Sequence, residues 1–240
     1  MSVTHDGLEG SIVDFYNGAK SSEKTKVQEY LQKLDNLEGK GITLDALHTS
    51  KKTLSLIHEK SGVYLCQVKG NQKHLLEDLE HIAEHLPYQS TSHTVEKGHG
   101  RIETRSAFQY SVNHEVLDQG WESTGIKTFA LIKRETINMK TGGITENNSI
   151  YISNNELNAA SFQSLCRAHW SVEVNNHTRD TVFGEDHFKS FDSDLQRSVA
   201  SILSYIHNGM NKMVKSRSIK RLKEDMIYSF KDVWRFFEMC

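Results

Sequence analysis

Hydrophobic positions in the first third of the chain alternate between helical spacing and short continuous runs. Apolar residues recur at helical spacing in residues 22–34, 50–60 and 73–85, which predicts three helices. Residues 41–45 and 63–68 are short apolar runs, which predict two strands. A strand, a short helix and a second strand in so few residues predict a right-handed parallel crossover. The chain is therefore predicted to begin with an α/β unit.

The pattern changes between residues 94 and 153, where polar and apolar positions alternate. Side chains at every second position from His99 to Arg105 are charged or ionisable, which is typical of one strand face, whether solvated or functional. Because helical patterns resume at residue 154, we interpret the stretch as an antiparallel β insertion that interrupts the α/β unit. The predicted organisation is a first part over residues 1–93, the β-rich insertion over residues 94–153 and a helical second part over residues 154–240.

Three helical patterns fill the last part of the chain. The first follows Ser153 and Glu156, which have the spacing of a capping box, and runs towards residue 176. Its face at positions 166, 169, 170, 173 and 177 mixes polar and aromatic residues, unlike a plain core face. Residues 193–214 carry an apolar stripe typical of core, and a last helix around residues 227–237 is predicted to close the fold.

Composition places the chain among globular proteins. It has 240 residues and a mass of 27.4 kDa, with 25% charged and 37% hydrophobic residues and a mean hydropathy of -0.56. No apolar run approaches the roughly 18 residues that a membrane span needs. The first ten residues lack the basic start and apolar stretch of a secretory leader, so we expect a cytoplasmic protein.

Charge and cysteine usage exclude several classes of function. The net charge of -2 argues against coating nucleic acid through bulk charge. Six basic residues and no acidic one lie between residues 208 and 223, either as a solvated helix end or as a patch that follows phosphates. Three widely spaced cysteines form no CxxC pair, so neither a disulfide frame nor a zinc site is indicated. The sequence has no Walker loop, GxGxxG or HExxH motif, which argues against a nucleotide cofactor or a zinc hydrolase.

Two acids stand out as candidate metal ligands. Asp45 ends a predicted buried strand, at the sheet edge where open α/β proteins bind ligands, and Glu173 lies on the mixed helix face. Carboxylates brought together from separate elements suit Mg²⁺ or Mn²⁺, because hard cations take oxygen ligands. The alternative is a capped turn for Asp45 and a surface glutamate for Glu173.

Weaker signals surround these acids. His169 and Trp170 precede Glu173 on the same helix, as part of a functional face or as a packed pair. Residues 70–72 follow the second predicted strand, and they suit either a backbone cradle for an anion or a simple turn.

Five blocks of the sequence together resemble a known family. The blocks are residues 42–52, 64–72, 99–105, 167–173 and 182–186. Their order and content resemble the H-repeat-associated transposases of bacterial insertion sequences, which belong to the DDE class. The resemblance implies an RNase H-like mixed sheet with flanking helices, interrupted by the antiparallel β insertion.

The resemblance also implies a chemistry. Asp45 would be the second acid of the DDE triad and Glu173 the third, holding Mg²⁺ or Mn²⁺ ions that activate water and then a DNA 3′-hydroxyl for attack on a phosphodiester. His169 stands where related families place the arginine of a Tyr-Arg-Glu-Lys signature. The residues expected to contact DNA are Lys69, Asn71, His169, Trp170 and Arg179.

The chain departs from the family pattern in two places. Family members carry a first catalytic aspartate in an Asp-Gly-Lys stretch on an earlier strand, and Asp6 lies too close to Asp45 to be that residue. We therefore expect an N-terminally truncated copy with an incomplete two-metal site. Between Glu173 and Phe183 the sequence is one residue shorter than the pattern, so an altered helix is expected there.

Three hypotheses for function follow. The first is an active transposase in which another residue or chain supplies the missing acid. The second is a catalytically inactive remnant that binds DNA or a full-length transposase. The third is an α/β fold with no nucleic-acid role. A transposase must handle the two DNA ends of its insertion sequence together, so a homodimer is also expected for the first hypothesis.

Overall fold

The computed structural model describes residues 2–5, 9–12, 20–112, 117, 120–188, 190, 192–214 and 218–239. The chain divides into two compact units. One consists of residues 20–167, and the other combines residues 1–19 with residues 168–240. Asp6 lies outside the described residues. None of the described helices is long and apolar enough to cross a membrane.

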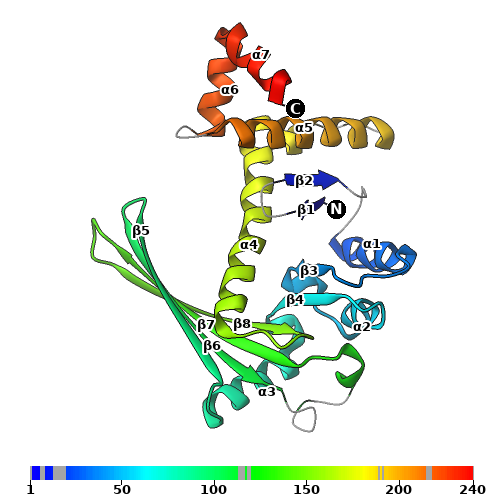
Figure 1. Ribbon diagram of the computed structural model, residues 1–240, viewed down its shortest axis with the longest axis vertical. Coiled ribbons are helices and arrows are strands. Elements are labelled where there is room, and N and C mark those ends of the chain that lie inside the picture. The colour runs from blue at the N-terminus through cyan, green and yellow to red at the C-terminus, as the bar shows by residue number, and fades with distance from the viewer. Residues whose placement is uncertain are drawn as a thin grey trace. The chain divides into compact units, whose positions relative to one another are not determined.

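A six-stranded mixed sheet forms the centre of the unit of residues 20–167 (Figure 1). Its strands, in spatial order, are β3 (Gly41–Leu44), β4 (Val63–Val68), β8 (Ile144–Ser153), β7 (Thr128–Asn138), β6 (Arg101–Ser111) and β5 (Ser90–Gly98). Strands β3 and β4 are parallel and are joined through helix α2 (Lys51–Glu59), which confirms the predicted crossover. The other four pairs of neighbours are antiparallel.

The β-rich stretch is continuous with the α/β unit. Leu65 of β4 pairs with Ser153 of β8, so all six strands belong to one sheet. The antiparallel strands were predicted, but the first of them begins at Ser90 and not at residue 94. Strand β5 is composed mainly of small polar residues, so its start carries no hydrophobic alternation that could mark it.

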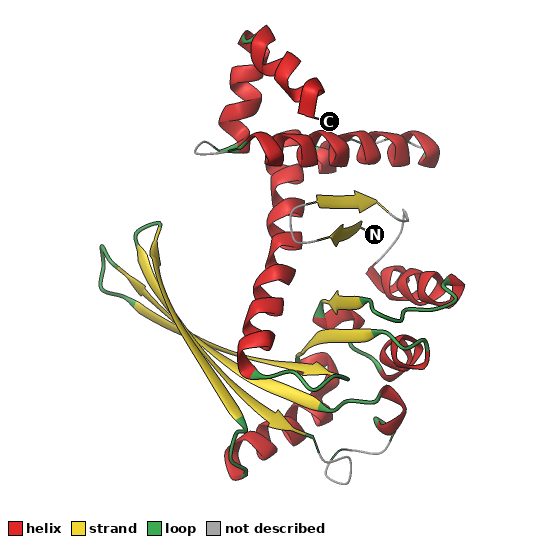
Figure 2. Ribbon diagram, in the orientation of Figure 1, coloured by secondary structure: helices red, strands yellow, loops and turns green. Residues whose placement is uncertain are grey.

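Helices cover both faces of this sheet (Figure 2). Helix α3 (Lys73–His85) lies against one face, where the Tyr110 hydroxyl donates to the carbonyl of Ala83 at 3.4 Å. The first half of helix α4 (Ala159–Thr178) lies against the other face, where Phe162 belongs to a buried cluster with Ala107 and Ala130. Helix α1 (Lys20–Lys33) packs against α2. The mixed sheet with flanking helices agrees with the predicted fold class.

Helix α4 begins later than the capping-box spacing predicted. The Asn158 side chain accepts the backbone N–H of Ser161 at 2.8 Å, so Asn158 caps the helix. Ser153 instead accepts the backbone N–H of Asn155 at 3.1 Å and forms a turn at the end of β8. Ser and Asn serve in turns and caps alike, and the spacing alone does not separate the two uses.

Asn154 joins the end of β8 to the start of β4. Its buried side chain accepts the Tyr64 N–H at 2.9 Å and donates to the Gly62 carbonyl at 2.8 Å. Asn154→Ala leaves both buried backbone groups without partners, and we expect it to lower the free energy of unfolding by about 1–3 kcal/mol. Urea denaturation measures this loss. An equal effect from Asn148→Ala, at an exposed position of β8, would contradict the assignment.

The second unit contains a short hairpin, the second half of α4 and three further helices of its described residues. The hairpin pairs β1 (Ser2–His5) with β2 (Glu9–Ile12), and the helices are α5 (Ser193–Met213), α6 (Ile219–Tyr228) and α7 (Phe230–Met239). Met210, Met213, Leu222 and Phe236 form its buried cluster. The predicted helix over residues 193–214 is confirmed. The last predicted helix is two helices. Helix α7 packs against α5 through Phe236, whereas Phe230, Trp234 and Phe237, which were predicted to pack, are exposed.

Candidate functional site

Asp45 lies directly after β3, at the carboxyl end of the strand. It caps the short helical turn Ala46–His48, and its Oδ1 accepts the Ala46 N–H at 2.6 Å. The side chain is exposed, and its second oxygen has no hydrogen-bond partner among the described residues. The capped turn and the ligand hypothesis are therefore compatible, because one oxygen shapes the turn and the other faces solvent.

Side chains from the turn that follows β4 donate hydrogen bonds to the loop that follows Asp45. Asn71 donates to the Ala46 carbonyl at 2.8 Å, and Gln72 donates to the Thr49 carbonyl at 2.9 Å. Thr49 in turn donates to the Gln67 carbonyl at 2.7 Å. These bonds connect the carboxyl ends of the two parallel strands and restrict the backbone after Asp45.

The segment after β4 is a short helical turn, Gly70–Gln72. Because the Asn71 amide donates to a backbone carbonyl, the turn interpretation is the one that its contacts support. Lys69, which precedes the turn, is exposed. In this unit the structure therefore brings Asp45, Lys69 and Asn71 to neighbouring loops of the sheet edge.

A buried histidine near Asp45 was missed by the sequence analysis. His48 Nε2 lies 3.5 Å from a carboxylate oxygen of Glu23 on α1, and its Nδ1 has no hydrogen-bond partner among the described residues. No spacing motif marks this pair, because its members lie on separate elements. It fixes the turn after Asp45 to helix α1.

Glu173 lies in the second half of α4 and is exposed. His169 is half-buried and Trp170 is exposed one turn earlier on the same helix, so the polar and aromatic face is present as predicted. Cys166 differs from these residues, since it belongs to the core of the unit of residues 20–167, and burial raises the pKa of its thiol to about 12. Asp45 and Glu173 belong to different compact units.

Two exposed carboxylates are the candidate metal ligands among the described residues. The exposed oxygens of Asp45 and Glu173 suit a hard divalent cation as single ligands. No group of three or more His, Cys, Asp or Glu side chains is arranged to hold a metal ion in the part of the chain that the structure describes.

Arg179 begins a π-helical turn, Arg179–Phe183, in the segment where an altered helix was expected. Its Nε lies 3.1 Å from Glu185 Oε2, and its terminal amino group donates to Asn176 at 2.9 Å. Only 12% of the Arg179 side chain is exposed. These contacts give Arg179 a part in the local fold, and its contact with DNA stays a prediction.

His207 on α5 is buried near this turn, with Phe183 at its ring edge and Asn211 one turn along the helix. Burial, and then the charge of Arg179, lower the pKa of His207. The unfolded chain therefore binds more protons once the pH falls below the unfolded histidine pKa of about 6.5. The stability that neutral His207 contributes is present above this pH and is lost as the pH falls towards the folded pKa.

We expect the loss of stability between about pH 7.5 and about pH 5.5 to be smaller in His207→Gln than in the unchanged chain. Urea denaturation at each pH measures it, and the comparison uses the change with pH within each protein. His187→Gln, at an exposed position of the same unit, serves as the control. Identical pH dependence in all three proteins would contradict the prediction.

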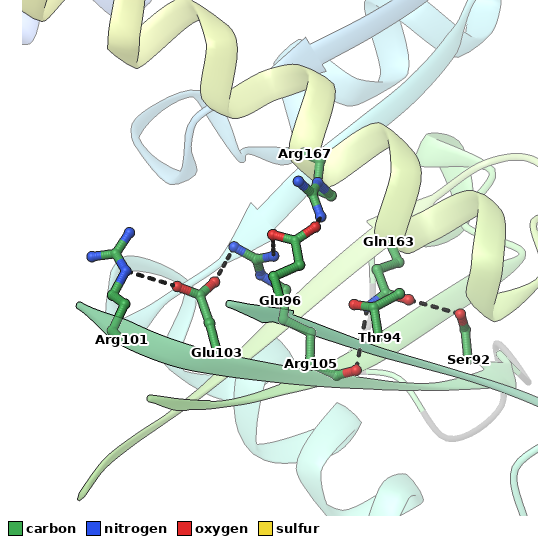
Figure 3. A network of polar contacts seen from close by, with 8 residues as sticks. All are labelled: Ser92, Thr94, Glu96, Arg101, Glu103, Arg105, Gln163 and Arg167. Atoms are coloured by element: carbon green, nitrogen blue, oxygen red, sulfur yellow. Dashed lines mark hydrogen bonds and ion pairs between the residues drawn. The ribbon is translucent and has the colours of Figure 1, made fainter. Parts of the chain in front are cut away.

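A polar network between the sheet and α4 was also not predicted (Figure 3). Gln163 of α4 accepts from Ser92 at 2.7 Å and donates to Thr94 at 2.8 Å on β5. Glu96 lies two residues after Thr94 on the same face of β5, and it pairs with Arg105 and Arg167. The signal in the sequence was the alternation of charged residues up to Arg105, which shows the face but not its partners.

The sheet, its crossover and its flanking helices define a protein of the RNase H-like α/β class. The family described as transposase DDE domain matches residues 1–208, and the chain belongs to this family. The resemblance stated from the sequence blocks is thereby confirmed.

Three curated relatives illustrate the match. YbfL of Escherichia coli strain K12 is 35% identical over 182 residues, which cover 71% of this chain and 47% of the relative. From the same strain, "H repeat-associated putative transposase YhhI" is 34% identical over 177 residues, again covering 71% and 47%. YncI of Escherichia coli O157:H7, also named for a transposase, is 36% identical over 177 residues, covering 70% and 44%. The chain spans about half the length of these relatives.

Among solved structures, DesVI of Streptomyces venezuelae aligns over 58% of this chain and 58% of its own, with a TM-score of 0.24 and 9% identity. This similarity is too low to indicate a shared fold.

Proposed function

We propose that this chain acts on DNA as an insertion-sequence transposase, using divalent metal ions for strand cleavage and transfer. The observation that carries the proposal is the placement of Asp45. It is an exposed acid at the carboxyl end of β3, in a chain that belongs to the transposase DDE domain family. Hard divalent cations, Mg²⁺ or Mn²⁺, would bind Asp45 and Glu173 and supply Lewis acidity for attack on a phosphodiester.

The other residues have supporting roles in this proposal. Asn71 holds the backbone next to Asp45, which orients the carboxylate, and it would lie beside DNA bound at this edge of the sheet. Lys69 directly precedes the turn that contains Asn71, and its exposed side chain would meet a DNA phosphate. On α4, His169 and Trp170 would meet DNA beside Glu173, and Arg179 would shape the turn that follows. A second copy of the chain is the expected protein partner.

The second candidate function is a catalytically inactive remnant that binds DNA or a full-length transposase. It is supported by the donor set of the described residues, which offers no group of three or more metal-binding side chains. A two-metal site shares ligands between its ions, so the absence of a first acid would remove catalysis before it removed DNA binding.

One experiment separates the two candidates. The purified full chain is incubated with Mg²⁺ and supercoiled plasmid that carries the inverted repeats of an H-repeat element, and nicked circles are counted on a gel. Metal-dependent nicking supports the transposase. Binding to the plasmid without nicking supports the remnant, and the absence of both contradicts the transposase and a DNA-binding remnant.

A further inference from the structure

Four arginines lie on one face of the sheet around the first half of α4. This arginine cluster consists of Arg101 and Arg105 on β6, Arg134 on β7 and Arg167 on α4. Arg101 and Arg105 are four positions apart on one strand and therefore share a face. Arg105 and Arg134 stand directly opposite each other in the register, and Arg167 contacts the same face through Glu96 of β5.

Two glutamates hold three of these arginines, Arg101, Arg105 and Arg167, in place (Figure 3). Glu103 is buried between Arg105, with which it forms an ion pair, and the Nε of Arg101 at 3.7 Å. Glu96 pairs with Arg167 and lies 3.3 Å from Arg105. The hydrogen bond from Arg167, followed by the charges of both arginines, lowers the pKa of Glu96, so its carboxylate stays ionised. The guanidinium groups of Arg101, Arg105 and Arg167 are thus oriented before any ligand binds.

The face carries excess positive charge in spite of these glutamates. Its strand residues and α4 contribute four arginines against Glu96 and Glu103, an excess of two charges on a chain whose net charge is -2. On the opposite face of the same strands, the positive and negative charges are equal in number. They are Lys97, Lys133, Glu135 and Glu146. The excess is therefore confined to the face that adjoins α4.

Two further observations indicate a site for an anion. Like charges directly opposite on neighbouring strands destabilise a sheet, and Arg105 and Arg134 stand in this relation. Arg101 and Arg167 keep 53% and 47% of their side chains exposed. Each of these two meets a glutamate through one nitrogen of a guanidinium group that carries five N–H donors.

We propose that the arginine cluster binds phosphate groups along a DNA backbone. Guanidinium groups match phosphate geometry, and held in place they lose little entropy on binding. Arg101 and Arg105 are about 13 Å apart along the strand, which exceeds one phosphate group and suits a polymer of phosphates. The inference rests on the proposed function, because it assigns part of the DNA contact of that protein to the β-rich face.

Fluorescence anisotropy with a labelled duplex DNA, measured over a range of salt concentrations, tests the proposal on the full chain. The variant is the double substitution Arg101→Gln with Arg167→Gln, which leaves Arg105 to pair with both glutamates. Each lost phosphate contact lowers the slope of log affinity against log salt by about 0.9, so we expect a loss of about 2 for the pair. Lys97→Gln, on the opposite face of β5, is expected to keep the original slope.

The outcomes distinguish this inference from the function on which it rests. If the unchanged chain binds DNA and the double variant keeps its slope, the arginine cluster is not a DNA contact, and the proposed function stands without it. If the unchanged chain binds no DNA at low salt, both fail together. Tighter binding of a duplex RNA of the same length would overturn the assignment to DNA. Equal thermal unfolding midpoints of the variant and the unchanged chain establish that the fold is retained.

Discussion

Asp45→Asn is expected to reduce Mg²⁺-dependent nicking of plasmid DNA by about 100-fold or more. A metal ion contributes several kcal/mol to such a reaction, and the neutral amide is a poor ligand for a hard cation. The substitution spares the fold, because asparagine is as good a cap as aspartate and its amide oxygen can still accept the Ala46 N–H. DNA affinity is therefore expected to change little.

The same variant has a readout that does not depend on nicking. Electron paramagnetic resonance of free Mn²⁺ measures how much metal the chain binds, and we expect weaker binding in Asp45→Asn and in Glu173→Gln. Glu80→Gln, an exposed acid on α3, is the matched control and is expected to bind Mn²⁺ like the unchanged chain. Unchanged Mn²⁺ binding and nicking in Asp45→Asn would remove this acid from the proposed site.

Phe162→Ala is expected to lower the free energy of unfolding by about 3–5 kcal/mol. The side chain is fully buried in the cluster that holds the first half of α4 on the sheet, with Leu65, Ala107 and Ala130 around it. Removing the ring takes away its apolar burial and leaves a cavity that the strands cannot close, because their hydrogen bonds fix their spacing. Urea denaturation followed by circular dichroism measures the loss.

Leu165→Ala gives the comparison for Phe162→Ala. Leu165 lies on the same helix but is exposed, so its truncation is expected to cost about 0.5 kcal/mol or less. Both substitutions replace a helical residue by alanine, and helix propensity therefore does not separate them. Equal losses in the two variants would mean that α4 does not depend on this face of the sheet.

The elements predicted best are those whose pattern reports burial directly. Strand β4 is short, apolar and mostly buried, and helix α2 joins β3 to it with its apolar face buried, so the pairing of this unit follows from its connection length. Strand β3 was predicted to be buried as well, which is wrong: it lies at an edge of the described sheet, with a neighbouring strand on one side only, and its side chains are partly exposed. The place of Asp45 at the end of β3 follows from the same pattern. The start of β5 was predicted late, because its polar residues pair through the backbone and not through an apolar face.

The predictions that failed concern what an element packs against. The apolar positions of α7 have helical spacing, yet Phe230 and Trp234 are exposed and only Phe236 is buried in the cluster of that unit. Periodicity shows that a face is apolar but does not name the surface that covers it. The sequence also did not show that Arg179 pairs with Glu185, although its expected contact with DNA stays a prediction.

The sequence by itself determined the family, the parallel crossover from β3 to β4 and the acid at the end of a strand, because these depend on local pattern and on matched blocks of residues. Only the tertiary structure decided which charges face each other. Glu96, Glu103 and Arg167 lie far apart in the chain or on different elements, and strand register together with the packing of α4 brings them together. Register and packing are set by many weak contacts at once, and no single stretch of sequence records their sum.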